Sequence, residues 1–218
     1  MTDPTFEFRV KERKVFAFGG KGGLNKFGFE EFMMTELFDV FPYLENDKVI
    51  IRKMDMSDVA ALSEISNNDN VYKYISPFLY KKSNKMLETA IKNLGGRDFE
   101  KKKLIIAGIY LTDNPDRLVG LAEMFDYKKK ANKITVGYRL NEDYWNKKIA
   151  SNALNLMVEY LVSKIGITTL NAFVMPGNIY SSKVLLSNGF VKEDYTSQEK
   201  NWGGKEIVSV DVYTYRKM

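Results

Sequence analysis

The middle of the chain carries three apolar segments in a row, and their spacing limits the folds that the chain can adopt. The segments are KLIIAGIYLT (103–112), RLVGLAEMFDY (117–127) and KITVGYRLN (133–141). The first two are joined by DNPD and the next pair by KKKAN, and both connections are rich in turn-forming residues. Strands that are joined by such short turns pair antiparallel. We therefore expect a three-stranded antiparallel meander.

Regular elements are also predicted before the meander. KVIIRKM (48–54) has the apolar content of a strand. Ser57 is a suitable N-cap for a helix that runs to about residue 66, and Ser83 for a second helix that runs to about residue 94. The meander therefore follows one strand and two helices.

A long helix follows the meander. WNKKIASNALNLMVEYLVSKIG (145–166) repeats apolar residues at spacings of three and four, which predicts a helix with one apolar stripe. After it we expect a strand at 168–175, a short helix at 180–188 and a terminal hairpin at 191–217 that turns near Trp202. This order predicts an α/β fold with a mixed, mostly antiparallel sheet of about seven strands, flanked by helices.

The first 47 residues differ from the rest and are interpreted as an N-terminal extension of a domain that spans 48–218. Residues 1–47 contain nine of the fourteen phenylalanines of the chain. Residues 30–41 read as a short amphipathic helix that ends before Pro42. So much aromatic surface is unfavourable in water, so we expect this extension to pack on the main domain or on a partner chain, including a second copy in a homodimer.

The glycine-rich stretch VFAFGGKGGLNKFGF (15–29) allows two interpretations. It resembles a variant phosphate-binding loop of ATPases, but Phe27 stands where the hydroxyl ligand of magnesium is needed. It also suits a glycine turn between two strands. The predicted meander and hairpin do not match the alternating parallel units of such ATPases, so we interpret the stretch as a turn within the extension.

Composition excludes several kinds of chemistry. The chain has no histidine and no cysteine, so a Ser-His-Asp triad, a cysteine acyl-enzyme and a structural zinc site are excluded, and no metal is expected. The net charge of +5 favours anionic ligands such as nucleotides, although the short lysine clusters make nucleic acid an improbable partner. No apolar run long enough for a membrane helix occurs, and a cytoplasmic location is expected.

Two segments carry a resemblance to a known family. VGYRLNEDYW (136–145) leads into the long helix, and NIYSSKVLLSNGF (178–190) fits the pattern N-x-x-S-x-x-V-L-x-x-x-G-F at every fixed position. Residues 48–216 resemble the Gcn5-related N-acetyltransferase (GNAT) superfamily, most of all its ribosomal-protein N-acetyltransferase branch. The resemblance implies transfer of an acetyl group from acetyl-CoA to a primary amine, by direct attack in a ternary complex.

The resemblance also implies where acetyl-CoA binds. Backbone groups of the strand before the long helix pair with the pantetheine arm, and the N-terminus of that helix holds the pyrophosphate through its free N–H groups and its dipole. The residues implied for this site are Tyr138, Arg139, Leu140, Asn146, Lys147, Lys148, Ile149, Ala150, Ser151, Asn178 and Ser181.

The pyrophosphate loop departs from the family pattern W-G-K-G-Y-A. This chain reads Trp145-Asn146-Lys147-Lys148-Ile149-Ala150, so both glycines are replaced. We expect helical φ and ψ at these positions, which lysine accepts without strain. Lys147 and Lys148 then either pair with the phosphates or form a solvated basic first turn.

The catalytic residues are implied less directly. Ser181 lies by resemblance near the sulfur, where it can protonate the leaving thiolate, and the tyrosine that many relatives carry four positions later is Leu185 here. Asn178 and Ser181 also suit a helix cap. Without histidine the base must be another group, and Glu123 is the first candidate because a charge within an apolar strand needs a reason. The weaker candidates are Asp126 and Glu142.

The acceptor and its pocket are the least constrained. Tyr138 and Tyr195 are candidates to line the acceptor pocket, although strand tyrosines are often ordinary packing residues. A protein N-terminus and a small amine both fit. Two alternatives stay open: a catalytically inactive acyl-CoA-binding or regulatory protein on the same fold, and an interaction module without cofactor.

Overall fold

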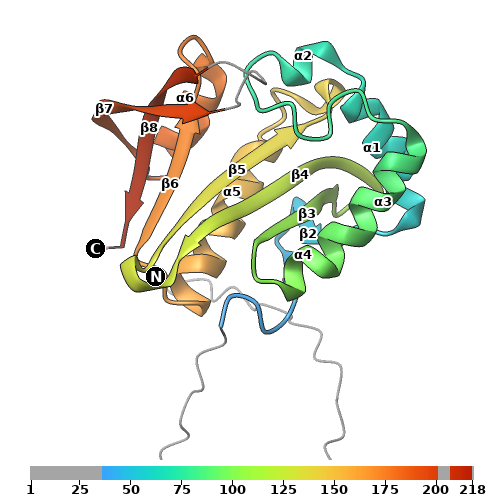
Figure 1. The fold of residues 1–218 in the computed structure, drawn as a ribbon, viewed down its shortest axis with the longest axis horizontal. Helices are drawn as coiled ribbons and strands as arrows, with labels where there is room; N and C mark the ends of the chain where they lie inside the picture. The colour runs from blue at the N-terminus through green and yellow to red at the C-terminus, as the bar shows by residue number, and fades with distance from the viewer. Residues whose placement is uncertain (1–35, 201–206, 218) are drawn as a thin grey trace, which may run out of the picture.

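The computed structural model describes residues 36–200 and 207–217, and these form one mixed α/β sheet structure (Figure 1). The sheet has eight strands in the order β1-β2-β3-β4-β5-β6-β8-β7. All neighbouring strands are antiparallel except β5 and β6, which are parallel. The strands are β1 (Leu44–Glu45), β2 (Val49–Arg52), β3 (Leu104–Leu111), β4 (Asn114–Lys128), β5 (Lys133–Leu140), β6 (Thr169–Val174), β7 (Val191–Lys200) and β8 (Ile207–Arg216).

The predicted meander, the strand before it and the terminal hairpin are confirmed as β3–β5, β2 and β7–β8. The sheet has one strand more than expected, because Leu44 and Glu45 pair with Ile51 and Ile50 as the short edge strand β1. Strand β1 lies within the segment that was assigned to the N-terminal extension. The turn of the hairpin near Trp202 lies outside the described residues.

The helices predicted within residues 48–218 all occur in the predicted order, and further short helices that the sequence did not predict lie between them. They are η1 (Met56–Asp58), α1 (Val59–Ser66), α2 (Asp69–Tyr72), α3 (Asn84–Gly95), α4 (Arg97–Glu100), η2 (Lys129–Ala131), η3 (Glu142–Tyr144), α5 (Ile149–Glu159), the π-helical η4 (Tyr160–Lys164) and α6 (Ile179–Ser187).

The N-cap predicted at Ser57 is wrong. Asp55 takes that position, because its carboxylate accepts a hydrogen bond from the Ser57 N–H and Asp58 completes a capping box with the Asp55 N–H. Helix α3 starts after Ser83 as predicted, although the Ser83 side chain makes no capping hydrogen bond.

The long helix is shorter than its apolar stripe predicts. Helix α5 spans Ile149–Glu159 and continues as one π-helical turn, Tyr160–Lys164. Residues 145–148 precede it as a loop, which places the start of the helix four residues later than expected.

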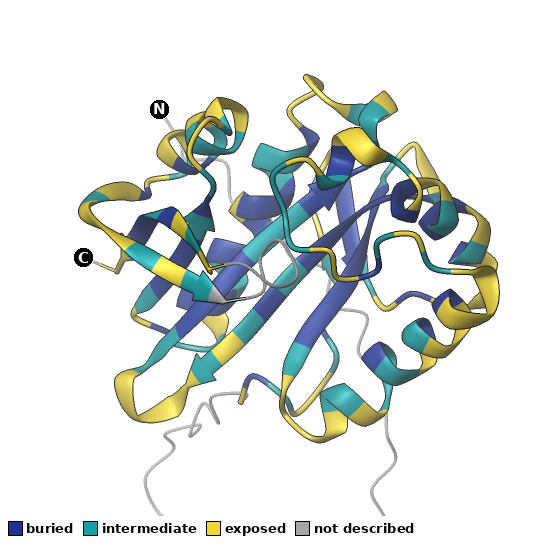
Figure 2. Ribbon diagram, turned by 45° about the horizontal axis from the view of Figure 1, so that its top comes forward, coloured by how far each residue is buried: buried dark blue, intermediate teal, exposed yellow. Residues whose placement is uncertain are grey.

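Both faces of the sheet are buried, which explains the apolar runs in its central strands. In β2, Val49 and Ile51 point into the core under α5, whereas Ile50 points into a second core under α1 and α3. The same alternation occurs in β3, where Ile105 and Ile106 enter opposite cores. Figure 2 shows the resulting band of buried residues along the central strands.

The described end of the Phe-rich segment packs on the main sheet. Leu37 is buried, and the rings of Phe38 and Phe41 lie 5.7 and 5.1 Å from that of Phe99. This part forms a turn at residues 37–39, so the helix predicted at 30–41 is wrong over its described end. The glycine-rich stretch at 15–29 lies outside the described residues.

No helix in the described part of the chain is long and apolar enough to cross a membrane.

Candidate active site

Strands β5 and β6 pair over only three residues and then separate. Their register runs from Lys133↔Thr169 to Thr135↔Asn171. Strand β5 continues to Leu140 in register with β4, and β6 continues to Val174 in register with β8. Beyond Thr135, the backbone edge of β5 that faces β6 therefore has no ladder partner among the strands that the structure describes, and Figure 1 shows the two strands diverging.

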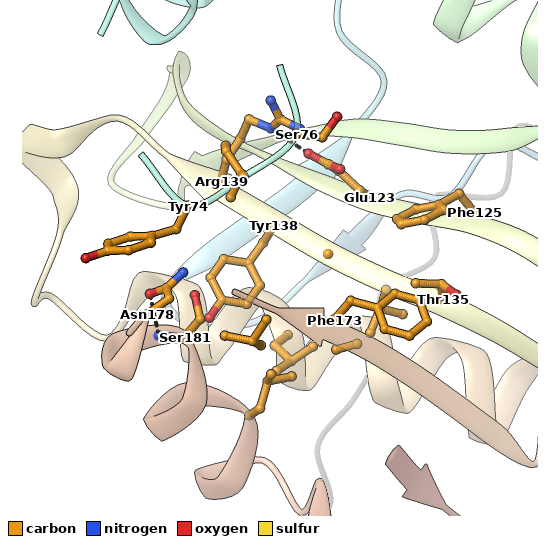
Figure 3. A pocket seen from close by; sticks show the side chains of 17 residues that line it. Tyr74, Ser76, Glu123, Phe125, Thr135, Tyr138, Arg139, Phe173, Asn178 and Ser181 are labelled. Carbon is orange, nitrogen blue, oxygen red and sulfur yellow. Dashed lines mark hydrogen bonds and ion pairs between the residues drawn. The ribbon is translucent and has the colours of Figure 1, made fainter. Parts of the chain in front are cut away.

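A cavity opens where the two strands separate. Figure 3 shows its walls, which come from β4, β5, β6, α6, one residue of α5 and the loop after α2. The lining residues are Tyr74, Ile75, Ser76, Glu123, Phe125, Thr135, Val136, Gly137, Tyr138, Arg139, Leu154, Ala172, Phe173, Val174, Asn178, Ser181 and Leu185.

Five of the predicted site residues meet in this cavity: Glu123, Tyr138, Arg139, Asn178 and Ser181. They come from the consecutive strands β4 and β5 and from the start of helix α6, which lies much further along the chain. The remaining predicted residues, Leu140 and Asn146–Ser151, do not line it.

Glu123 faces the cavity and is paired with Arg139. Arg139 Nε donates a 2.6 Å hydrogen bond to Glu123 Oε1, and the two side chains are 4% and 13% exposed respectively. The second carboxylate oxygen, Oε2, lies 3.6 Å from the point where a Cβ at Gly137 would stand. The absence of a side chain at Gly137 therefore leaves open space next to that oxygen.

The Arg139 guanidinium is held from three sides. Besides Glu123, it donates from Nη1 to the Phe78 carbonyl oxygen at 2.8 Å and lies 5.3 Å from the centre of the Tyr72 ring. Burial lowers the pKa of Arg139, but the Glu123 carboxylate and the Tyr72 side chain together outweigh burial, so the pKa of Arg139 is raised. The prediction for Arg139 rested on its backbone, and its side chain fixes the position of the carboxylate.

Asn178 and Ser181 begin helix α6. Asn178 Oδ1 accepts a 3.3 Å hydrogen bond from the Ser181 N–H, so Asn178 is the N-cap of the helix. Capping is one of the two roles predicted for Asn178, the other being contact with CoA. This bond sets the side of the cavity on which Ser181 lies, as the dashed line in Figure 3 marks.

The hydroxyl group of Tyr138 ends beside α6. Its oxygen is buried and has no hydrogen-bond partner among the described residues. Burial raises the pKa of Tyr138 to about 12, and the neighbouring Ser181 side chain acts in the opposite direction. Leu185, at the position where many relatives carry a tyrosine, is a buried residue of the cavity wall. The phenol group on this side of the cavity therefore belongs to Tyr138 on β5 and not to a residue of α6.

The loop before α5 adopts the left-handed backbone, contrary to expectation. Asn146 and Lys148 both have φ of 59°, and Lys148 is the N-cap of the helix. The prediction of helical φ at both positions is wrong, because the chain keeps the backbone that glycine favours although it lacks the glycines. Asparagine tolerates this region well, whereas lysine is strained there.

The start of α5 offers donors and positive charge. The N–H groups of Ile149, Ala150 and Ser151 precede the first intrahelical bond, which runs from Asn152 N to Lys148 O. Lys147 lies 5.4 Å from the centre of the Tyr144 ring, and neither Lys147 nor Lys148 forms an ion pair with a described residue. Leu154, further along the same helix, lines the cavity. At a rise of 1.5 Å per residue, it lies about 8 Å along the helix axis from Ile149, the first helical residue.

Several lining residues were missed by the sequence reasoning. Tyr74 and Ser76 lie in the irregular segment between α2 and α3, where no periodicity marks them. Phe125 lies on β4 and Phe173 on β6. Both have apolar neighbours in the sequence, so the sequence does not show that these two side chains face a cavity and not the packed core.

The weaker candidates lie elsewhere. Asp126 pairs with Lys128 on the surface, and Tyr195 is 53% exposed on β7, so neither lines the cavity. Glu142 accepts hydrogen bonds from the Asn70 and Asn68 side chains, which lower its pKa. Glu142 thus connects α2 to η3 and lies outside the cavity.

No group of three or more potential metal ligands occurs within residues 36–200 and 207–217. Within the described part of the chain, the site has features that suit a CoA thioester: an unpaired strand edge, a helix start with free N–H groups, two lysines without ion pairs and a buried hydroxyl without a hydrogen-bond partner. Fold and site together define an acyltransferase that uses such a donor.

Comparison with known proteins places the chain in a family. The acetyltransferase (GNAT) domain matches residues 48–191, more than half of the chain, and the chain belongs to this family. It is an acetyl-CoA-dependent acyltransferase. The chain is 27% identical over 161 residues to the uncharacterized N-acetyltransferase YoaA of Bacillus subtilis (strain 168), which covers 73% of this chain and 88% of YoaA.

Solved structures share the fold. A putative ribosomal-protein-serine acetyltransferase from Vibrio cholerae superposes with a TM-score of 0.69 at 16% identity, covering 80% of this chain and 97% of that one. The microcin C7 self immunity acetyltransferase MccE, in complex with acetyl-CoA and AMP, gives a TM-score of 0.67 at 17% identity over 79% of this chain and 94% of the other.

Proposed function

We propose that the chain is an N-acetyltransferase that moves the acetyl group of acetyl-CoA to a primary amine by direct attack in a ternary complex. The observation that carries the proposal is the cavity between β5 and β6. It brings one carboxylate, Glu123, and two hydroxyl groups, Tyr138 and Ser181, to a gap between strands whose backbone edges are unpaired.

The donor's pyrophosphate is assigned to the start of α5. The N–H groups of Ile149, Ala150 and Ser151 and the helix dipole favour an anion there. Lys147 and Lys148 lack carboxylate partners among the described residues, so each can pair with a phosphate. A cation at a helix N-terminus is unfavourable by itself, and a bound anion removes that penalty.

The pantetheine arm is assigned to the free edge of β5. Trp145 Nε1 already donates to the Leu140 carbonyl oxygen at 3.1 Å. The Asn141 N–H donates to the Val119 carbonyl oxygen of β4, so by strand alternation Arg139 also directs its backbone groups toward β4. Tyr138 directs its N–H and C=O toward the free edge and is the backbone position proposed for the arm. Asn178 uses Oδ1 for the helix cap, so its Nδ2 is the group to donate to the arm. N–H groups on the same edge would stabilise the negative charge that forms on the acetyl carbonyl oxygen when the amine attacks the acetyl carbon.

Glu123 is proposed as the base. An amine arrives largely as ammonium and must lose a proton before it attacks the thioester. Arg139 holds Oε1, so Oε2, next to the space at Gly137, is the atom that accepts the proton. Ser181, at the far wall of the cavity, is proposed to face the sulfur.

The acceptor is proposed to be a protein N-terminus or a small amine. Phe125, Phe173 and Tyr74 give its side of the cavity an aromatic lining. The name of the Vibrio cholerae neighbour, a putative ribosomal-protein-serine acetyltransferase, suggests a ribosomal protein as one acceptor to test.

The test combines binding with turnover. Calorimetric titrations with acetyl-CoA, CoA and ATP–magnesium come first, followed by a screen of peptides and small amines for release of free thiol. Binding of both CoA forms but not ATP, with turnover on at least one amine, supports the proposal. CoA binding without turnover on any amine indicates a regulatory protein, and no CoA binding indicates an interaction module.

A further inference from the structure

Tyr138 carries a polar group that the described residues leave without a hydrogen-bond partner. Its hydroxyl oxygen is shielded from solvent, lines the cavity and has no hydrogen-bond partner among the described residues. Buried polar groups are nearly always paired, and an exception inside a cavity points to a partner that arrives with a ligand. Figure 3 shows the ring reaching from β5 across the cavity to Ser181 on α6.

We propose that the Tyr138 hydroxyl donates a hydrogen bond to the sulfur of CoA as the bond between sulfur and the acetyl carbon breaks. This inference rests on the proposed acetyl transfer and adds a catalytic residue to it. Tyr138 then acts through its side chain, beyond the backbone role that the sequence resemblance implies.

The opposite faces of the sheet support this assignment. Ala122 is in register with Tyr138, and Glu123 with Gly137, so the side chains of Tyr138 and Glu123 leave the sheet on opposite faces. The cavity connects both faces where β5 and β6 separate. An amine that loses its proton to Glu123 approaches the acetyl carbon from one side, and the sulfur leaves toward the other, where Tyr138 lies.

The surroundings of the hydroxyl suit a sulfur atom. Leu154, Ala172, Val174 and Leu185 line the cavity on the α5 and α6 side, and they are buried apolar residues. An apolar wall excludes water, which would otherwise solvate the departing thiolate. In that setting a fixed hydroxyl donor is worth more than it is in water.

The hydroxyl serves as a donor and keeps its proton. With its pKa raised to about 12, Tyr138 stays protonated across the neutral range, and a thiol with a pKa near about 8.5 does not take that proton from it. A hydrogen bond to the thiolate lowers the energy of the leaving group without proton transfer.

The bonds and protons balance. The amine gives one proton to Glu123, its lone pair forms the bond to the acetyl carbon, and the nitrogen sheds a second proton. The bond between carbon and sulfur breaks with its electron pair on sulfur. The thiolate, held by Tyr138, takes a proton from solvent, so the products are the amide, CoA and one released proton.

The test uses CoA and desulfo-CoA, which lacks the sulfur, and needs no acceptor. Calorimetry measures the dissociation constants of both for the full-length wild-type chain, Tyr138→Phe and Tyr160→Phe, at pH 7 and at a pH above the thiol pKa. Tyr160 is a matched control because burial also raises its pKa to about 12 while it lies outside the cavity. Ultraviolet absorbance of the thiolate gives the pKa of the bound thiol.

The expected result is specific to sulfur. For the wild type and Tyr160→Phe, the bound thiol has a lowered pKa and CoA binds more tightly at the higher pH. Tyr138→Phe removes both effects and leaves desulfo-CoA binding unchanged within about twofold. Equal weakening of both ligands by Tyr138→Phe, or no effect on either, overturns the inference while leaving the proposed function intact. Failure of the wild type to bind either ligand overturns both.

Discussion

Arg139 Nε and Glu123 Oε1 are 2.6 Å apart, and this contact joins β5 to β4 beside the cavity. A guanidinium that is 4% exposed needs this partner, and the carboxylate needs a fixed direction if it is to accept a proton from a substrate. One interaction therefore serves both the stability of the sheet and the proposed chemistry, with the remaining oxygen directed at the open space next to Gly137.

Glu123→Gln separates these two roles. The amide oxygen still accepts from Arg139, but the charge is lost, so we expect the free energy of unfolding to fall by about 1 to 3 kcal/mol. The rate of acetyl transfer at neutral pH should fall about 10²- to 10⁴-fold, the usual contribution of a general base. Denaturant unfolding and initial rates, measured below the melting temperature, give both values.

The matched control for this change is Glu64→Gln, at the surface pair that Glu64 makes with Arg117. It should leave the transfer rate unchanged and lower the stability by about 1 kcal/mol or less. In Glu123→Gln the rate should recover as pH rises toward the amine pKa, since free amine then needs no base. A wild-type rate in Glu123→Gln at neutral pH would remove Glu123 from the mechanism.

Tyr138→Phe should stabilise the ligand-free chain. The substitution deletes a buried hydroxyl without a described partner, so the free energy of unfolding should rise by about 1 kcal/mol. Tyr110→Phe is the opposite case, because the Tyr110 hydroxyl donates a 2.7 Å hydrogen bond to the buried Asp58 carboxylate. That variant should lose about 1 to 3 kcal/mol. Both values come from urea unfolding, and a loss of stability in Tyr138→Phe would show that its hydroxyl has a structural partner.

Much of the fold follows from local patterns in the sequence. The meander was predictable because its connections are short and rich in turn-forming residues, although β4 already begins at Asn114, within DNPD. Both faces of β2 and β3 are apolar because helices cover both sides, so the strands read as continuous apolar runs. The strand β1 was missed because two residues carry no periodicity.

The cavity was only partly predictable. Asn178 and Ser181 belong to one motif, and Glu123 stands out as a charge in an apolar strand, so these could be named from the sequence. Tyr74 and Ser76 could not, because an irregular loop reaches the cavity through tertiary contacts alone. The free hydroxyl of Tyr138 depends on how far β5 and β6 separate, which no local pattern encodes.

The backbone at Lys148 was predicted wrongly for a physical reason. Residue preference favours helical φ for lysine, but the turn into α5 requires the left-handed region, and packing of α5 outweighs a local cost of about 1 to 2 kcal/mol. The extent of the N-terminal extension, the cytoplasmic location and a homodimer stay predictions from the sequence.

Lys148→Gly tests strain and charge together, and Lys148→Gln, whose side chain is no better suited to this backbone than lysine, isolates the charge. Glycine relieves the φ of 59°, so the free energy of unfolding should rise by about 0.5 to 1 kcal/mol. Both variants should bind CoA about three- to tenfold more weakly at low salt, and the difference from wild type should shrink as salt screens the phosphates. Unfolding curves and calorimetry at two ionic strengths give these values. Unchanged affinity in both variants would show that Lys148 is only a solvated residue of the first turn.

Glu142→Gln should change how stability depends on pH. The hydrogen bonds from Asn70 and Asn68 lower the pKa of Glu142 below its ordinary value of 4.5. A lowered folded-state pKa means that the contribution is fully present above the unfolded-state pKa and is lost as pH falls through the folded-state pKa. The wild type should therefore lose its advantage over Glu142→Gln between neutral pH and pH values below 4.5, measured by urea unfolding across that range.

The same variant tests whether the loop after α2 shapes the acceptor side. Asn68 and Asn70 begin the segment that carries Tyr74 and Ser76 to the cavity, so loss of the Glu142 contact should raise the KM for the amine without changing the affinity for CoA. Glu88→Gln, on helix α3, is a charge-matched control that should change neither quantity. If the stability difference between wild type and Glu142→Gln is the same at pH 7 and pH 3, the hydrogen bonds to Asn68 and Asn70 do not depend on the charge of Glu142, and the loop is held by packing alone.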